Sequence, residues 1–166
     1  MIRTVLLGIV LLVGAVIVYE HGCRISESDV RAHHRAQLEA LRRFDSQTMC
    51  DSMAKDFMLR STEHVGGTQV RRDSRRDDTC EDMRDSTATL ETISRRTRGL
   101  LEVDFVVDIT RIDVAPGGRR ASVEATTTAS IAGQLISRSR TKGELSRAFW
   151  RIRDHGGEAQ TWVYVQ

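Results

Sequence analysis

The C-terminal stretch Leu100–Gln166 alternates apolar and polar residues in a pattern that predicts four β-strands in two successive hairpins. Its first strand, Leu101–Ile109, has the period of two that is typical of a strand buried on one face. Turn residues at Ala115–Gly118 and Asp154–Gly157 are expected to reverse the chain within each pair. The other strands are expected at 121–131, 137–153 and 158–166.

The first half of the chain has apolar residues at intervals of three or four, which predicts amphipathic helices. One helix is expected to start behind Ser26 as its cap and to end near Asp45. A second, shorter helix would begin at Asp45 or Ser46, and a third would open with Asp78–Glu81 and stop at Gly99. The apolar face of the first helix consists of Val30, His34, Leu38, Leu41 and Phe44.

A small hairpin is expected between the second and third helices, with strands at 57–64 and 68–72 around the turn Val65–Gly67. The order of elements is therefore helix, helix, hairpin, helix and four strands. This order indicates an α+β fold rather than alternating β-α units.

The N-terminus carries a separate signal. Arg3 precedes Thr4–Tyr19, sixteen residues without a charge, and such a start is typical of an export signal or a membrane anchor. We therefore expect residues 1–24 to be a signal or anchor and residues 25–166 to be the folded domain. An uncleaved inner-membrane anchor, a lipoprotein signal with lipidation at Cys23, and cleavage with secretion all remain open. Each of the three places the domain outside the cytoplasm, in a periplasm or cell envelope.

That location changes the interpretation of the remaining cysteines. In an oxidising compartment Cys50 and Cys80 are expected to form a disulfide, which would stabilise the fold by roughly 3 to 4 kcal/mol. Two separate buried thiols are the alternative. The cysteines and histidines do not have metal-ligand spacing, so neither a metal nor another cofactor is expected.

Charge excludes some partners. The 25 basic and 23 acidic residues leave a net charge of +2, which does not predict a nucleic-acid partner. The basic residues are nearly all arginine, which indicates a GC-rich bacterial genome. Arg138, Arg140 and Lys142 alternate along one face of the third long strand. This row would receive an acidic protein partner or a lipid headgroup, or it is simply a solvated face.

The chain resembles the nuclear transport factor 2-like superfamily, the cone-shaped α+β fold shared with ketosteroid isomerase and polyketide-cyclase-like proteins. The resemblance covers Ser26–Gln166 and implies a strongly bent antiparallel four-stranded sheet, with the helices and the small hairpin packed on it. It rests on the run Phe44-Asp45…Met53–Phe57, the hairpin Thr110–Val114…Ala121–Glu124 and the ending Ala148–Arg153…Thr161–Val163.

The resemblance also implies a cavity at the open end of the cone. Enzymes of this superfamily place a general base and an oxyanion donor in that cavity. His34 is the candidate base and Tyr164 the candidate oxyanion donor, while a hydrogen-bonded core histidine is the alternative for His34. The residues expected to line the cavity are His34, Leu38, Phe105, Val107 and Thr127, which are mostly apolar.

Two functions follow as hypotheses. The first is a membrane-tethered, non-catalytic binding or assembly module of the bacterial envelope, because the anchor is combined with a cavity that has no evident acid and base pair. The second is a carrier or enzyme, similar to an isomerase or cyclase, that holds a small apolar ligand in the cone. A homodimer is an expectation from the resemblance alone.

Overall fold

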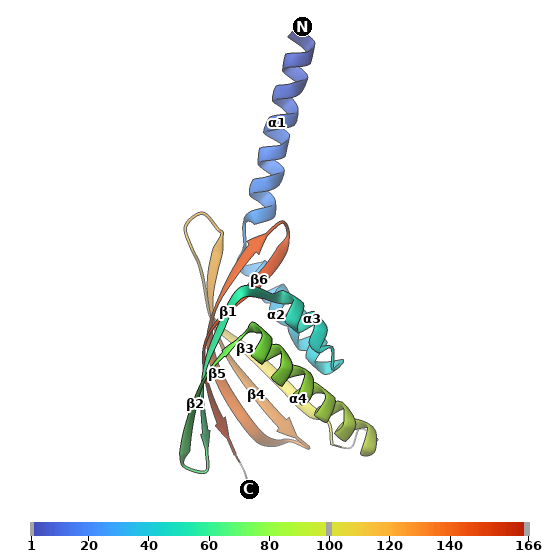
Figure 1. Cartoon of the computed structure of the whole chain (residues 1–166), viewed down its shortest axis with the longest axis vertical. Helices are drawn as coiled ribbons and strands as arrows, with labels where there is room; N and C mark the ends of the chain where they lie inside the picture. The colour runs from blue at the N-terminus through green and yellow to red at the C-terminus, as the bar shows by residue number, and fades with distance from the viewer. Residues whose placement is uncertain (1, 99–100, 165–166) are drawn as a thin grey trace.

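The computed structural model describes residues 2–98 and 101–164, and in the N-terminal helix the side chains from Ile9 on, except that of residue 21. Figure 1 shows a curved sheet with helices on one side and a long helix extending from one end. The elements in order are α1 Ile2–Cys23, α2 Glu27–Arg42, α3 Ser46–Ser52, β1 Met53–Val65, β2 Thr68–Arg75, α4 Arg76–Arg96, β3 Val103–Val114, β4 Arg120–Ile131, β5 Gln134–Ala148 and β6 Arg151–Val163.

The strands form one six-stranded sheet in the order β2-β1-β6-β5-β4-β3. The α+β class is confirmed, but the predicted four-stranded sheet is wrong because the small hairpin joins it. β1 pairs in parallel with β6, whereas the other neighbours are antiparallel. β2 lies at the edge, and most of its side chains are exposed. Because most side chains on both faces of β2 are exposed, this strand needs no apolar face, which explains why it shows little alternation.

α2, α3 and α4 cover one face of the sheet, and no described helix covers the other (Figure 1). Alternation along β3 and β4 turns apolar side chains toward the helices, as the sequence predicts. Two groups of buried side chains lie between the layers. One contains Ile25, Val30, Ala121, Val123 and Leu145; the other contains Cys50, Met53, Phe57 and Cys80.

The helix starts follow the expected capping rules with one correction. Ser26 caps α2, and the carboxylate of Asp45 accepts the backbone N–H of Thr48 at the start of α3. α4 begins at Arg76, two residues before the predicted start. Asp78 is therefore inside its first turn, where the carboxylate accepts the backbone N–H of Arg75 at 3.2 Å. Asp78 is thus the partner residue of a capping box and not the cap that the sequence predicts.

The turn between the last two strands is not at Asp154–Gly157. It lies at Phe149 and Trp150, which both have positive φ. Gly156 and Gly157 lie inside β6, also with positive φ. A Cβ at Gly156 would overlap the carbonyl of Met58, and one at Gly157 would overlap the carbonyl of Lys142. The glycine pair therefore lets the neighbouring strands β1 and β5 approach β6 closely, and it does not make a turn.

Three predicted boundaries lie outside the residues that the structure describes. Gly99, the predicted stop of the third helix, and Leu100, the predicted start of the strand region, lie outside the described residues. The same holds for residues 165–166 at the predicted end of the last strand.

Candidate functional site

The predicted base, His34, lies half-buried on α2 beside His33, and the two rings meet edge to face with centroids 5.9 Å apart. The Nε2 of His34 is buried without a hydrogen-bond partner among the described residues. Burial lowers the pKa of His34. Burial, together with repulsion from His34, lowers the pKa of His33 to about 4. Both rings are therefore neutral near pH 7, so they can accept a proton but carry no charge.

The space between the helices and the sheet holds a small recess. It lies among α2, α4 and β3, has a volume of about 20 Å³, and Phe105 is among its lining residues. The other predicted lining residues, Leu38, Val107 and Thr127, are half-buried. A recess of that volume has room for about one water molecule. It does not fit a ligand with several carbon atoms.

Tyr164, the predicted oxyanion donor, is exposed just beyond the end of β6. Its backbone N–H donates to the carbonyl of Ile136. Figure 1 places this end of the chain at the far end of the sheet from α1. An exposed phenol in that position gives no support to a role in the interior of the cone.

The largest hollow among those described, about 710 Å³, lies on the uncovered face of the sheet. We call this surface the open face. The predicted row of Arg138, Arg140 and Lys142 lines it. Acidic residues on three other strands line the same hollow: Asp108 on β3, Glu124 on β4 and Glu158 on β6. The row is therefore not a purely basic strip.

Contacts on the open face pair these charges within the chain. The ammonium of Lys142 is 3.4 Å from the carboxylate of Glu124. The guanidinium of Arg140 lies 5.8 Å from the ring centre of Trp162, at a distance compatible with a cation–π contact. Because the charged groups are exposed, each pair adds little to stability. The exposed charged groups therefore remain accessible to a binding partner.

α1 meets the domain at a cluster of aromatic side chains. The rings of Tyr19 and Phe149 meet edge to face with centroids 5.6 Å apart. The backbone N–H of Trp150 donates to the carbonyl of Gly22, and the Trp150 ring lies against that glycine. Phe149 and Trp150 are 64% and 54% exposed, so this turn presents large apolar surface beside the end of the helix.

The side chains of α1 from Ile9 to Tyr19 are all exposed, and most are apolar. Measured by length and hydropathy, no helix within the described residues reaches the threshold for crossing a membrane. Cys23, the predicted lipidation position, is buried at the end of α1.

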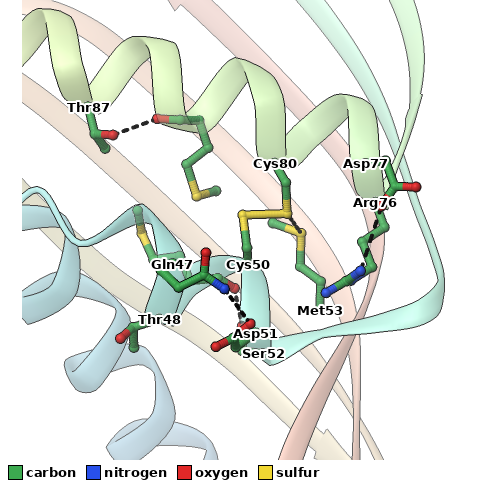
Figure 2. The surroundings of a disulfide bond; sticks show 12 residues. Gln47, Thr48, Cys50, Asp51, Ser52, Met53, Arg76, Asp77, Cys80 and Thr87 are labelled. Carbon is green, nitrogen blue, oxygen red and sulfur yellow. Dashed lines mark hydrogen bonds and ion pairs between the residues drawn. A yellow bond between two sulfur atoms is a disulfide. The ribbon is translucent and has the colours of Figure 1, made fainter.

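The predicted disulfide is supported by the structure. Cys50 on α3 and Cys80 on α4 are joined, with their Cα atoms 5.6 Å apart (Figure 2). The sulfur of Cys80 also lies 3.7 Å from that of Met53 at the start of β1. The bridge therefore ties two helices together above the first strand.

One histidine lies in a different environment from the predicted one. His155 falls within the predicted turn Asp154–Gly157, but it lies half-buried in β6 and hydrogen-bonds to Ser146 and Asp56. The sequence offers one signal for this site, the glycine pair that follows His155 inside a strand, because glycine there often marks a bulge. Elsewhere, the described residues contain no group of three or more His, Cys, Asp or Glu placed to hold a metal ion.

Comparison with known proteins identifies the fold. No protein-family model and no curated protein matches the sequence. Solved structures do match, among them a nuclear transport factor 2-like protein of unknown function from Silicibacter pomeroyi, with 14% identity and a TM-score of 0.50 over 82% of this chain and 94% of that one. A nuclear transport factor 2-like protein of unknown function from Pseudomonas putida has 12% identity and a TM-score of 0.53 over 81% of this chain and 84% of that one.

A protein of unknown function from Mycobacterium tuberculosis is also similar, with 10% identity and a TM-score of 0.52 over 83% of this chain and 71% of that one. The chain has the nuclear transport factor 2-like fold, which confirms the resemblance read from the sequence. At these identities the similarity establishes the fold and leaves the activity to the residues themselves.

Proposed function

We propose that this protein is an extracytoplasmic binding and assembly module of a bacterial envelope, held at a membrane by α1, that pairs with a second copy through its open face. The proposal rests above all on the end of the domain from which α1 extends. At that end, an exposed apolar helix lies beside an exposed aromatic turn, and both features are typical of a surface in contact with a membrane.

The aromatic turn supports the membrane tether. Phe149 and Trp150 are exposed, and they lie against Tyr19 and Gly22 in the last turns of α1. Aromatic side chains are enriched where proteins meet the headgroup region of a membrane. A helix inserted among lipids would bring this turn to the level of the headgroups, where the exposed rings would be stabilised.

The disulfide supports a location outside the cytoplasm. Cys50 and Cys80 are both nearly fully buried and joined across two helices. Disulfides of this structural kind persist in oxidising compartments and are rare in the cytosol.

The charge pattern of the open face supports a second copy of this chain as its occupant. Arg138, Arg140 and Lys142 form a basic row on β5, while the strands on both sides carry Glu124 and Glu158. A surface that carries both signs in adjacent rows can complement itself about a two-fold axis. A strongly acidic partner would instead be repelled by the flanking carboxylates.

Flotation of the purified full chain with vesicles of phosphatidylethanolamine and phosphatidylglycerol tests the tether. We expect the wild type to float with the vesicles and Leu12→Arg to float much less, because a charge in the apolar segment is costly to bury. Leu135→Arg is the matched control, since Leu135 is also exposed but lies in β5. A wild type that stays with the soluble protein, or an equal loss in the control, would refute the tether.

Protease treatment of spheroplasts tests the location. Digestion of the domain in intact spheroplasts is expected, whereas protection until the cells are lysed would place the domain in the cytoplasm.

Sedimentation of the detergent-solubilised full chain tests the assembly. A dimer is expected, and the double variant R138E/R140E should raise its dissociation constant about tenfold or more, because like charges then face one another. The variant R31E/R35E changes two exposed arginines on α2 and should leave the dimer intact. A monomer at every concentration, or equal weakening by both variants, would overturn pairing through the open face.

A further inference from the structure

Three side chains near the α1 end of the sheet form a continuous chain of hydrogen bonds. The Oγ of Ser146 on β5 is 2.8 Å from Nε2 of His155 on β6. The other ring nitrogen of His155, Nδ1, is 2.8 Å from a carboxylate oxygen of Asp56 on β1. Hydroxyl, imidazole and carboxylate therefore occur in the order that activates a serine nucleophile.

Irregular pairing on both sides of His155 produces this arrangement. Between β5 and β6, Gly143 pairs with Gly157 and Leu145 with Asp154, so the register shifts opposite His155. Between β1 and β6, Met53 pairs with Asp154 and Met58 with Gly156, so residues 54–57 of β1 stand opposite His155 alone. Such bulges redirect side chains and are common beside active sites.

The carboxylate fixes the protonation pattern of the imidazole. An ionised carboxylate can only accept a hydrogen bond, so the proton of neutral His155 lies on Nδ1, facing Asp56. Nε2 is then free to accept the hydroxyl proton of Ser146. The ring is positioned on both sides, and its side chain is only 20% exposed. A neutral ring in this orientation is a competent general base.

A hollow of about 550 Å³ lies beside the serine, and both Ser146 and His155 line it. Its charged lining consists of one acid, Asp51, and four bases: Lys55, Arg76, Arg151 and Arg153. The Nε of Arg76 is buried and has no hydrogen-bond partner among the described residues. Ser146 itself pairs with Arg120 and Arg153 on the two neighbouring strands. Because the backbone N–H groups there belong to the sheet, the donors left for an oxyanion are guanidinium groups of this hollow, of which Arg153 already donates through one nitrogen to the carbonyl of Asp51.

We propose that Ser146, His155 and Asp56 form an acyl-transfer site that hydrolyses esters bearing a negative charge. The Oγ of Ser146 attacks the ester carbonyl carbon while its proton passes to Nε2 of His155. The C–O bond to the alcohol then breaks, and the leaving alkoxide takes that proton. Water next attacks the acyl carbon and gives a proton to Nε2 of His155. The bond from that carbon to Oγ then breaks, Oγ takes the proton back from His155, and the acid is released with Ser146 and neutral His155 regenerated. The basic hollow holds the charge of the substrate.

Ser146 and His155 are the catalytic residues, and Asp56 is a positioning residue that acts through the imidazole. This activity goes beyond the proposed binding and assembly role. The three residues are not among those that the sequence predicts to line the cone, and for this reason the sequence favours a non-catalytic module.

The test uses the full chain in mild detergent with its disulfide intact. Hydrolysis of 4-nitrophenyl hemisuccinate, an anionic ester, is compared with that of neutral 4-nitrophenyl acetate, and a fluorophosphonate probe is mapped by mass spectrometry. We expect the probe on Ser146 and a higher kcat/KM for the hemisuccinate. Ser146→Ala should abolish labelling, and His155→Asn should lower kcat/KM about 100-fold or more.

Matched controls separate chemistry from folding. Ser139→Ala removes another serine of β5, one whose Oγ accepts a hydrogen bond from Thr161 rather than contacting a histidine. His64→Asn removes a histidine that stacks on Trp162. Both should keep activity, and thermal melting should show every variant folded. Arg151→Gln should reduce the preference for the hemisuccinate without abolishing hydrolysis of the acetate.

The positioning role of Asp56 requires a separate measurement. Its side chain is 71% exposed, so solvent weakens its influence on the imidazole, and Asp56→Asn should lower kcat less than His155→Asn with KM unchanged. Asp56→Glu should restore part of the loss.

Absence of labelling on Ser146 in folded wild type, or equal hydrolysis by wild type and Ser146→Ala, would overturn the site. R138E/R140E should weaken the dimer without changing hydrolysis, so failure of one proposal is distinguishable from failure of the other.

Discussion

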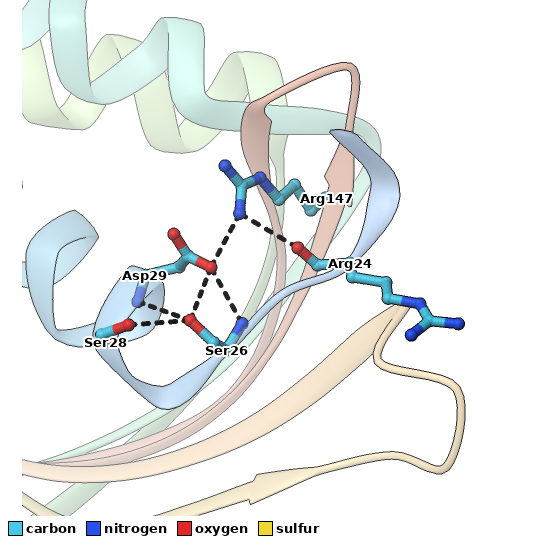
Figure 3. A network of polar contacts seen from close by, with 5 residues as sticks. All are labelled: Arg24, Ser26, Ser28, Asp29 and Arg147. Carbon is cyan, nitrogen blue, oxygen red and sulfur yellow. Dashed lines mark hydrogen bonds and ion pairs between the residues drawn. The ribbon is translucent and has the colours of Figure 1, made fainter. Parts of the chain in front are cut away.

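Asp29, in the first turn of α2, and Arg147, near the end of β5, form an ion pair in which the guanidinium nitrogen is 2.7 Å from the carboxylate (Figure 3). The same nitrogen donates to the carbonyl of Arg24 at 3.0 Å. The carboxylate also accepts the backbone N–H and the hydroxyl of Ser26. This network fastens the segment between α1 and α2 to the sheet.

Replacing Arg147 should therefore destabilise the domain. Arg147→Met keeps much of the side-chain volume but leaves Asp29 and the Arg24 carbonyl without their partner. We expect the free energy of unfolding to fall by about 1.5–3 kcal/mol, the usual range for hydrogen bonds to charged groups. Urea denaturation measures it. Arg151→Met, at an exposed arginine beyond the next turn, should change it little, and equal losses would contradict the role of the network.

Asp29 should also contribute to acid sensitivity. Burial disfavours its charged form, but the hydrogen bonds from Ser26 and the charge of Arg147 outweigh burial and lower the pKa of Asp29. A carboxyl whose pKa is lowered by folding stabilises the native state above its unfolded pKa of about 4. That contribution is lost as pH falls through the lower native value. Asp29→Asn should flatten the dependence of unfolding free energy on pH in this acidic range, and an unchanged slope would argue against it.

Alternation predicted the strands well where one face is buried. In β3 and β4 the side chains toward the helices, such as Val123 and Ala125, are buried while their neighbours are less so. The turn at Phe149 and Trp150 was missed because neither residue carries a turn signal. The first hairpin was predicted at its position in the sequence, but its membership in the main sheet was not. Pairing of β1 with β6 joins residues about a hundred positions apart, and a local pattern contains no information about such contacts.

The same limit explains why the hydrogen-bonded serine was not predicted. Ser146 and His155 are 9 residues apart, but Asp56 is 99 residues from His155. Only the register of three strands brings the three groups together. His34, by contrast, is predicted on the apolar face of its helix, and the structure shows it half-buried, because helical periodicity alone decides which side of a helix a residue occupies.

His33 on α2 should make stability depend on pH between about 6.5 and about 4. Burial and the neighbouring His34 lower the pKa of His33 from 6.5 to about 4, so the unfolded chain binds a proton that the folded chain does not. The free energy of unfolding should therefore fall by about 1–3 kcal/mol as pH drops from about 6.5 to about 4. His33→Gln should show a shallower decline than wild type when unfolding is measured across this range. An identical decline would show that the ring is not protonated on unfolding.

Loss of the disulfide between α3 and α4 should lower the stability of the domain. The bridge spans a sequence separation of 30 and contacts the sulfur of Met53. We expect Cys50→Ser/Cys80→Ser to lower the free energy of unfolding by about 3 kcal/mol, because the unfolded chain gains freedom. Thermal melting of wild type with and without reductant should give the same loss. Cys23→Ser is the control, and a melting temperature insensitive to reductant would refute the bridge.

The bulge at His155 should depend on Gly156. Its φ is +81°, and a Cβ there would overlap the carbonyl of Met58 on the neighbouring strand. Gly133 has nearly the same φ, +80°, with nothing within 4 Å of the corresponding position. Gly133→Ala therefore reports the backbone strain alone, about 1–2 kcal/mol. Gly156→Ala adds a clash with main chain that cannot move without breaking the pairing of β1 and β6. Urea denaturation should show a larger loss for Gly156→Ala than for Gly133→Ala. Equal losses would mean that β1 can move away from β6, and the close approach that aligns Asp56 with His155 would then not be required by the fold.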